Sequence, residues 1–385
     1  MAERKDCMYQ MTDDQKLFVE QVRKMVCEKV APRSAEIDKT GQFPWDLKEV
    51  FQEMGLLGLS VPEAYGGCYQ GDLYVCLAVE EIARACVSSS LIVQVQSLGW
   101  HPILIGGSEQ QKAKYGPGIA SGQLLAAYGL TETGAGSDAA SMKTTAVRNG
   151  NHYVINGSKC FISNGPIADV VTVFAMTDRS KGVKGISAFI VEKSYPGFSV
   201  AKWESKMGIK GSPTGELVFE DMEVPAENLI GEEGKGFIYA MESLDASRPV
   251  IAAQSVGLAQ GALDQAIAYA KQRVQFGKPI IAFQGISWML AEMAAQIEAA
   301  RALTYQAADM ITSCDPRRTY MSACSKLIAS DAAMKVATDA LQIAAGYGYM
   351  TEFPFERMMR DAKITQIYEG TNQIQKLVIA RELTK

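Results

Sequence analysis

The sequence contains few of the residues that build metal sites and disulfide frameworks. Its 385 residues include only two histidines, His101 and His152, and the eight cysteines contain no CxxC pair. A zinc site needs several closely spaced Cys or His ligands, so zinc binding and Cys–His nucleophilic chemistry are disfavoured and no metal site is expected. We expect the cysteines to be reduced, as is usual for a cytoplasmic protein.

The chain also lacks a basic block and a long apolar run. Lys and Arg number 38 against 43 Asp and Glu, which gives a net charge of −5. Nucleic-acid binding depends on a positive patch that displaces phosphate counterions, so this class of partner is disfavoured. No apolar run approaches the roughly 20 residues of a membrane span. Residues 1–15 lack the apolar core of a signal peptide, so we expect a cytoplasmic location.

Residues 1–122 have a helical period. Thr12 followed by Gln15 forms a capping-box pattern, and apolar residues then recur at helical spacing until Pro32, which is expected to end or kink the helix. Further helices are predicted to begin near Asp46 and near Asp72. We expect residues 1–122 to form an N-terminal α-helical domain.

Residues 123–230 have short segments rich in β-branched and aromatic residues. Asn149-Gly150 lies between two such segments, which is the strongest short-range signal for a hairpin. Further strands are predicted at 169–176, 185–193 and 215–224. This pattern predicts a middle β-domain, either a barrel or a sandwich.

Residues 231–385 return to helix and are rich in alanine. Long helical segments are predicted at 257–276, 289–311 and 324–345, joined by short connections. Such segments pack as an antiparallel bundle, so a C-terminal four-helix bundle is expected and the fold class is α+β.

A glycine-rich segment spans Tyr128 to Asp138. GAGSDA (134–139) matches the dinucleotide fingerprint, but a predicted hairpin follows it, where a Rossmann unit would have a helix. Two other interpretations remain: a plain turn, or a loop whose glycines let the backbone approach a ligand closely.

The same segment resembles the first signature of the acyl-CoA dehydrogenases, which are flavoproteins. Gly129–Glu132, Ala135–Asp138 and the small residue Ser141 all match. Residues 159–165 (KCFISNG) are similar to the family's segment against the flavin ring. Phe161 stands where Trp is common, and Ser163 stands where a hydroxyl lies near flavin N5.

A second signature of the family resembles residues 342–348 (QIAAGYG), with Ala345 where the family usually has glycine. From its composition alone, this segment is a helix C-terminus followed by glycines that adopt a positive φ. The resemblance adds that residues 342–346 approach the adenosine half of FAD in a neighbouring subunit. Arg273, Phe276 and Gln284 are similar to the family's other contacts across the subunit interface.

Two further segments carry charged residues. Glu369 in QIYEGTNQ (366–373) is either a surface glutamate that closes a helix or a carboxylate in an apolar stretch, where desolvation would make it a usable base. It resembles the family's catalytic base. Asp245–Pro249 is either an Asp–Arg pair at a helix start or proline kink, or the family's motif for coenzyme A. Some relatives place their base at position 247, which is serine here.

The resemblance implies the acyl-CoA dehydrogenase fold and FAD-dependent α,β-dehydrogenation of an acyl-CoA. Glu369 would remove the α-proton, and flavin N5 would accept the β-hydride. The Glu369 N–H and a ribityl hydroxyl would form the oxyanion site. The implied FAD contacts are Tyr128, Leu130, Thr131, Gly136, Ser137, Phe161, Ile162, Ser163, Arg273, Phe276, Gln284, Gln342, Gly346, Thr371 and Gln373. The implied substrate contacts are Ser137, Asp245, Arg248 and Gly370.

The implied partners are an electron-transferring flavoprotein as acceptor and further copies of the chain in a homotetramer, a dimer of dimers. Two alternatives stay open: an acyl-CoA oxidase that uses dioxygen, and a non-catalytic CoA-binding member of the fold. Residues 88–96, expected at the end of a helix, are predicted to line the acyl pocket. Relatives that take dicarboxylic acyl groups place an arginine there. This chain has none, so glutaryl-CoA is disfavoured. Leu91, Ile92 and Val95 make the site apolar and favour short, branched or alicyclic groups, and Gln94 would narrow the bottom of the pocket. A packing role for these residues is an equal alternative.

Overall fold

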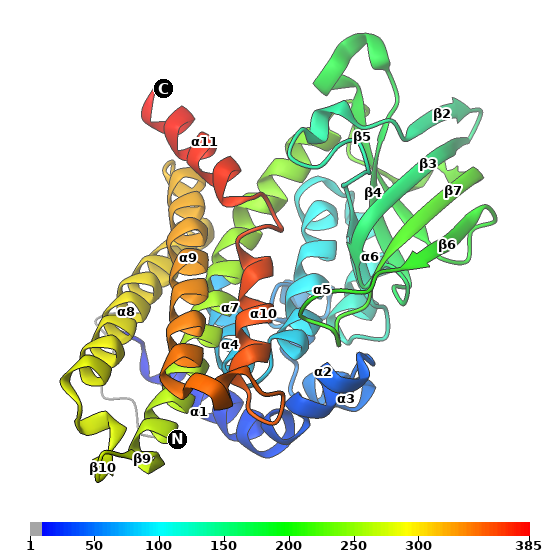
Figure 1. The fold of residues 1–385 in the computed structure, drawn as a ribbon. Coiled ribbons are helices and arrows are strands. Elements are labelled where there is room, and N and C mark those ends of the chain that lie inside the picture. The colour runs from blue at the N-terminus through cyan, green and yellow to red at the C-terminus, as the bar shows by residue number, and fades with distance from the viewer. Residues whose placement is uncertain (1–9) are drawn as a thin grey trace.

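The computed structural model describes residues 10–385, so Cys7 and most of the segment tested for a signal peptide lie outside the described part. Helices, then strands, then helices follow one another along the chain (Figure 1). This order confirms the predicted α+β class. The N-terminal helices are α1 (Asp13–Met25), α2 (Ser34–Thr40), α3 (Trp45–Glu53), α4 (Asp72–Ala85), α5 (Val87–Gly106) and α6 (Glu109–Ala120).

The first helix begins as its sequence predicts. Thr12 Oγ1 accepts a hydrogen bond from the backbone N–H of Gln15 at 3.2 Å, and the Gln15 side chain accepts one from the N–H of Thr12 at 3.0 Å. The chain then passes through a π turn (Val26–Val30) and a 3-10 turn (Ala31–Arg33) before α2. The predicted kink at Pro32 is confirmed, because proline has no N–H to continue the helical ladder.

Helix α5 corrects one prediction. Residues 88–96 lie in its first half and not at the end of a helix, because α5 runs from Val87 to Gly106. Every side chain from Val87 to Ile103 is buried. A helix that is covered on all sides has no polar stripe, so its sequence lacks the amphipathic period by which helices are recognised.

The middle of the chain forms one sheet, whose strands follow the order β6-β7-β3-β2-β4-β5-β8, with β1 parallel to β4. The predicted hairpin is confirmed, because β2 and β3 pair around Asn149-Gly150 and Gly150 has a φ of 62°. Strands β1, β6 and β8 were not predicted. The strands are β1 (Ala126–Gly129), β2 (Thr145–Asn149), β3 (His152–Ser163), β4 (Val170–Met176), β5 (Ile186–Glu192), β6 (Phe198–Trp203), β7 (Thr214–Pro225) and β8 (Leu229–Ile230).

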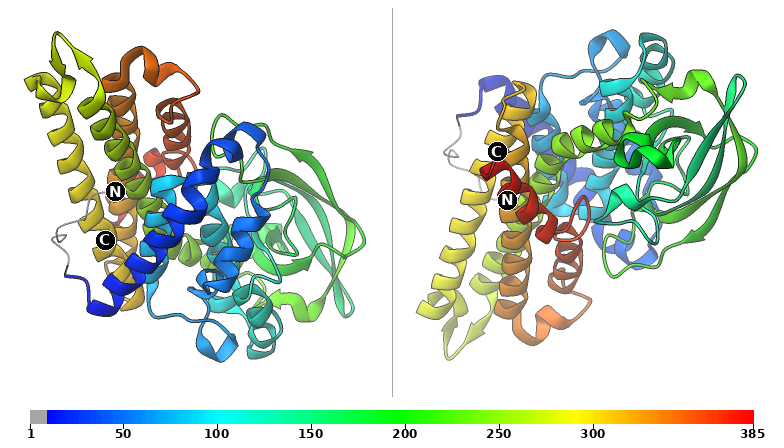
Figure 2. Two further views of the ribbon diagram at one scale, coloured as in Figure 1. Left: turned by 90° about the horizontal axis from the view of Figure 1, so that it is seen from below. Right: turned by 90° about the horizontal axis from the view of Figure 1, so that it is seen from above.

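Helices α7, α8 and α9 are the long helices of the C-terminal part. The prediction that the first of them starts near 257 was wrong, since α7 starts at Gly236 and contains Pro249 in its interior. The sheet lies to one side of the helices in both views of Figure 2. The elements are α7 (Gly236–Gln272), β9 (Val274–Gln275), β10 (Lys278–Pro279), α8 (Gln284–Thr312), α9 (Arg318–Ala344), α10 (Phe355–Thr365) and α11 (Asn372–Leu383).

Between residues 10 and 385, no helix is long and apolar enough to cross a membrane. Cys68, Cys76, Cys86, Cys160, Cys314 and Cys324 are free thiols.

Helix α7 passes close to α4 at two glycines. A Cβ atom added to Gly257 would lie 2.1 Å from the carbonyl oxygen of Glu80, and one added to Gly261 would lie 2.1 Å from that of Arg84. Both contacts are with backbone atoms, which cannot swing aside as a side chain can. Glycine at these two positions therefore allows the backbones of α4 and α7 to approach this closely. Helix α7 also carries part of the site described below.

We predict that Gly257→Ala destabilises the protein by about 1–3 kcal/mol, the usual range for overpacking a core, because α4 and α7 must move apart. Differential scanning calorimetry would show a lower melting temperature. Gly285→Ala is the matched control, since Gly285 lies in the first turn of α8 and a Cβ there meets nothing within 4 Å. Equal melting temperatures for Gly257→Ala and the control would contradict this account of the contact.

Candidate active site

The loop between α10 and α11 presents Glu369 in an unusual backbone conformation. Glu369 has a φ of 51° and Gly370 a φ of 91°. The left-handed region costs an L-residue about 1–2 kcal/mol, so contacts around the loop must hold Glu369 there. Gln375 Nε2 donates hydrogen bonds to the carbonyl oxygens of Glu369 at 3.2 Å and Gly370 at 2.9 Å.

Each oxygen of the Glu369 carboxyl group accepts a hydrogen bond from a different helix. Ser247 Oγ on α7 donates to Oε2, and Gln94 Nε2 on α5 donates to Oε1 at 3.4 Å. Burial raises the pKa of Glu369, and the two donors, together with the charges of Lys326 and Arg248, partly oppose that rise. A carboxyl group whose pKa is raised and whose two oxygens are oriented is suited to accept a proton.

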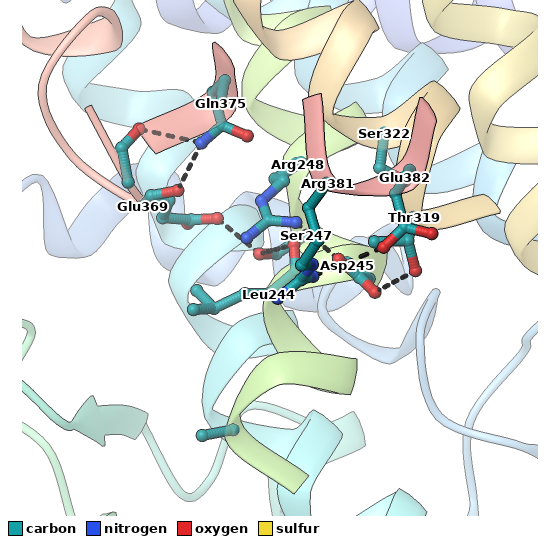
Figure 3. A network of polar contacts seen from close by, with 12 residues as sticks. Leu244, Asp245, Ser247, Arg248, Thr319, Ser322, Glu369, Gln375, Arg381 and Glu382 are labelled. Carbon is teal, nitrogen blue, oxygen red and sulfur yellow. Dashed lines mark hydrogen bonds and ion pairs between the residues drawn. The ribbon is translucent and has the colours of Figure 1, made fainter. Parts of the chain in front are cut away.

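Arg248 and Asp245 form an ion pair within α7. Arg248 Nη1 donates to Asp245 Oδ1 at 2.5 Å, and Thr319 Oγ1 donates to Asp245 Oδ2 at 2.6 Å. Figure 3 shows this pair in one polar network with Ser247 and Glu369. Arg248 is only 4% exposed, and its Nε has no acceptor among residues 10–385. A buried donor without an acceptor is rare, so the site favours a ligand or water that completes it.

A second part of the site lies on the sheet. Phe161 on β3 is 65% exposed and has a φ of 59°, so an aromatic ring is held away from the core. Ser163, two residues later on the same strand, is half-buried. An exposed aromatic ring beside a hydroxyl fits one face of a flat heterocycle such as the flavin.

The loop before β2 is fixed by a buried carboxylate. Glu132 accepts hydrogen bonds from the backbone N–H of Lys143 at 2.6 Å and of Thr144 at 3.0 Å, and from Lys159 Nζ at 2.7 Å. A Cβ atom at Gly134 or Gly136 would meet nothing within 4 Å, so the backbone there is open to a ligand. The loop lies next to β3, since the N–H of Cys160 donates to the carbonyl oxygen of Thr131 at 2.9 Å, so its open backbone edge is available to a ligand beside Phe161.

The remaining predicted residues of this half differ in exposure. Tyr128 OH donates to the carbonyl oxygen of Ala240 at 3.2 Å, and the side chains of Leu130 and Ile162 are buried in the core. Leu130 and Ile162 can therefore reach a ligand mainly through backbone atoms. Thr131 is half-buried, Gly136, Ser137 and Gln373 are exposed, and Thr371 caps α11 by accepting from the N–H of Ile374 at 3.3 Å.

A separate group of predicted residues lies around the hairpin of β9 and β10. A pocket of about 530 Å³ is lined there by Arg273 and by residues 343–347, with Arg273 stacked 5.4 Å from the ring centre of Tyr347. Phe276 is 93% exposed. Gln284 and Gln342 are also exposed. This hairpin lies at the far end of the bundle from the sheet (Figure 1). One chain therefore does not bring these residues to Phe161.

The end of α9 corrects a prediction about backbone conformation. The sequence predicts positive φ at the glycines after the helix, but Ala345 adopts it, with a φ of 52° and a ψ of −130°, and neither Gly346 nor Gly348 does. A side chain rarely tolerates this region, so Ala345 is strained.

Two residues around Glu369 were missed from the sequence. Lys326 Nζ donates to the carbonyl oxygen of Gly370 at 2.9 Å, and Gln375 holds the same loop from α11. A lysine within the alanine-rich run of α9, fully buried in the structure, was the available signal. No spacing in the sequence links positions 94, 247 and 326 to 369, because they lie on three separate helices.

Comparison with known proteins matches three family descriptions along the chain: "Acyl-CoA dehydrogenase, N-terminal domain" at residues 12–123, "middle domain" at 127–222 and "C-terminal domain" at 234–384. The chain is 47% identical over 384 residues to cyclohex-1-ene-1-carbonyl-CoA dehydrogenase of Syntrophus aciditrophicus, covering 100% of this chain and 93% of that protein.

Two further proteins have a similar sequence identity to this chain. A short-chain specific acyl-CoA dehydrogenase of Clostridium acetobutylicum is 48% identical, over 97% of this chain and 99% of that protein. A chain in a solved structure described as "Electron transferring flavoprotein of Acidaminococcus fermentans" has a TM-score of 0.96 and 47% identity, covering 98% of this chain and 99% of that chain.

The strain at Ala345 leads to a prediction for adjacent positions. Ala345→Gly should raise the free energy of unfolding by about 1 kcal/mol, because relief of backbone strain exceeds the extra entropy of an unfolded glycine. Ala344→Gly is the matched control: Ala344 has a φ of −76°, so glycine there should lower stability by about 0.5–1 kcal/mol. Urea unfolding of both variants measures the difference. Equal destabilisation by the two changes would show that Ala345 is not strained.

Proposed function

The chain belongs to the acyl-CoA dehydrogenase family, and we propose that it dehydrogenates the α,β bond of an acyl-CoA thioester with Glu369 as the base. As a member of this family it is an FAD-dependent oxidoreductase, and a solved relative is described as complexed with FAD. The observation that carries the proposal is the half-buried Glu369 carboxyl group, whose two oxygens accept hydrogen bonds from Gln94 and Ser247 and whose pKa is raised by desolvation.

The α-proton of a thioester is weakly acidic, so its removal needs both a base and stabilisation of the enolate oxygen. The raised pKa of Glu369 makes its carboxylate a stronger proton acceptor than an exposed glutamate. The hydrogen bonds from Ser247 and Gln94 stabilise the ionised form of the carboxyl group and fix the orientation of its two oxygens. The side chain therefore combines basicity with a fixed direction.

The backbone N–H of Glu369 supplies a donor for the thioester oxygen. It donates to no acceptor among residues 10–385, whereas the carbonyl oxygens of Glu369 and Gly370 are both engaged by Gln375. A donor held ready for a developing oxyanion is typically worth about 2.7–4 kcal/mol. The left-handed turn thus gives the substrate a base and a hydrogen-bond donor from one residue.

FAD supplies the acceptor for the β-hydrogen, which leaves as hydride. Phe161, Ser163 and the backbone of residues 131–137 would hold its ring on the sheet side, with Thr371 and Gln373 beside them. The remaining predicted FAD contacts, Arg273, Phe276, Gln284, Gln342 and Gly346, would serve the cofactor of a neighbouring subunit. Their position at the far end of the bundle from the sheet supports a cofactor shared between two subunits, and we propose two such dimers in a tetramer.

The coenzyme A part of the substrate would bind near Asp245 and Arg248, with Ser137 and Gly370 as further contacts. Arg248 has the spare buried donor for this role, and its pairing with Asp245 fixes its orientation. The similarity to a chain from a structure of an electron-transferring flavoprotein supports such a protein as the electron acceptor.

We propose a short, branched or alicyclic acyl group as the substrate. Leu91, Gln94 and Val95 are buried on α5, where Gln94 donates to the base, so Leu91 and Val95 would give the acyl pocket an apolar wall beside one amide. No arginine lies between residues 86 and 97 to pair a distal carboxylate. Similar relatives are named for an alicyclic and for short-chain substrates, at almost equal identity, and support both.

Glu369→Gln tests the proposed base. The amide keeps the size and hydrogen bonding of the side chain but cannot accept the proton, so the variant should bind FAD while saturated acyl-CoAs no longer bleach it. General-base catalysis is typically worth about 10²–10⁴-fold, and at least this loss in the rate of anaerobic flavin reduction is expected by stopped flow. A variant that reduces its flavin at the wild-type rate would refute the role of Glu369.

A relocated carboxylate provides the control for this experiment. Ser247 contacts Glu369, so Ser247→Glu combined with Glu369→Gly places a carboxyl group in the same space from α7. Recovery of part of the lost rate is expected, since the new base approaches the α-carbon from a different direction.

A further inference from the structure

Lys326 is a buried cation whose hydrogen bonds go to the loop that carries Glu369. It lies on α9 and is 0% exposed. Its Nζ donates to the carbonyl oxygen of Gly370 at 2.9 Å and to Asn372 Oδ1 at 3.0 Å. Burial of a lysine is unfavourable unless its ammonium group is hydrogen-bonded, so these contacts determine where the side chain lies.

Two neighbours on α9 extend the attachment. Asn372 Nδ2 donates to Ser330 Oγ at 2.9 Å and to Asp331 Oδ1 at 2.8 Å. Gln366 Nε2 donates to the same Asp331 oxygen at 2.6 Å. Gln366 and Asn372 flank the segment that contains Glu369, so α9 holds this loop at both ends.

The loop needs such attachment because of its backbone conformation. Glu369 and Gly370 both have a positive φ. The carbonyl oxygen of Gly370 accepts from two donors, Lys326 Nζ and Gln375 Nε2. Two donors on one carbonyl fix the peptide plane that follows Gly370, and the direction of the Glu369 side chain depends on the conformation of this turn.

We propose that Lys326 is a positioning residue for the base: its ammonium group holds the carbonyl of Gly370, so that the Glu369 carboxyl group stays between Gln94 and Ser247. This inference rests on the proposed function of Glu369. Lys326 does not touch the reacting atoms, and it acts through the loop and through its charge.

The charge gives Lys326 a second effect on the base. Burial lowers the pKa of Lys326 to about 8, while the negative charges of Glu369 and Asp331 raise it and Arg248 lowers it. In return, the Lys326 cation lowers the pKa of Glu369 against the effect of burial. Loss of this cation therefore raises the pKa of Glu369, and the carboxylate then forms only at higher pH.

Lys326→Met tests the proposal, because methionine keeps most of the length of the side chain without donors or charge. A misplacement of about 1 Å can cost about 10²-fold, so kcat for anaerobic flavin reduction should fall by about that factor, with KM for acyl-CoA nearly unchanged. The rising limb of the pH–rate profile should move to higher pH, which a purely structural role would not cause. Lys335→Met is the matched control, since Lys335 lies on α9, is about half exposed and pairs with Asp339.

Asn372→Ala decides the matter if Lys326→Met fails to fold or to retain flavin. This change removes Asn372 Oδ1 as an acceptor for the Lys326 ammonium group but leaves the positive charge of Lys326. The value of kcat should therefore fall while the pH–rate profile stays in place. An unchanged kcat in a folded Lys326→Met protein, or in Asn372→Ala when only that variant folds, would overturn the positioning role. The proposed function would still stand if Glu369→Gln remained inactive, whereas a wild-type protein that no saturated acyl-CoA reduces would refute the function itself.

Discussion

The left-handed turn at Glu369 and Gly370 is the constraint on which the site depends. A helical or extended backbone at Glu369 would point the carboxyl group elsewhere, because the side-chain direction follows φ and ψ. The turn is unfavourable by itself, and it persists because α9 and α11 hold its carbonyl oxygens. Contacts from the folded helix bundle therefore fix the direction of the Glu369 carboxyl group.

The second requirement on this group is a balance between burial and ionisation. Burial raises the pKa and strengthens the base, yet complete isolation would leave the carboxyl group protonated. Hydrogen bonds from α5 and α7 and the charge of a lysine on α9 oppose the effect of burial. These helices come from distant parts of the sequence, and their donors and charge reach Glu369 only when the helices are packed together. The basicity of Glu369 therefore depends on this packing, including the close contact of α7 with α4 at the two glycines.

Much of the fold and part of the site could be predicted from the sequence. Local signals were reliable where the physics is local, as at the capping box of Thr12 and the hairpin at Asn149-Gly150. They failed for α5, which is covered on all sides and has no amphipathic period, and for the start of α7, which lies at Gly236 and not near 257. Ala345 carries the positive φ that was expected of its neighbouring glycines.

The site residues divide in the same way. Glu369 and the Asp245–Arg248 pair were found through segments that resemble a known family. Lys326 was not, since its role arises only where α9 meets the loop after α10. A buried polar side chain in an alanine-rich helix is visible in the sequence, but its partner is not.

The central claim is that Glu369 removes the α-proton, and proton exchange tests it apart from the redox step. Acetyl-CoA has acidic α-hydrogens but no β-carbon, so no hydride can leave it. The measurement is the uptake of deuterium from D₂O into its methyl group, followed by mass spectrometry with the FAD-loaded protein. The wild-type protein should catalyse this exchange, and Glu369→Gln should show only background exchange. Equal exchange by the two proteins would contradict the assignment of Glu369 as the base.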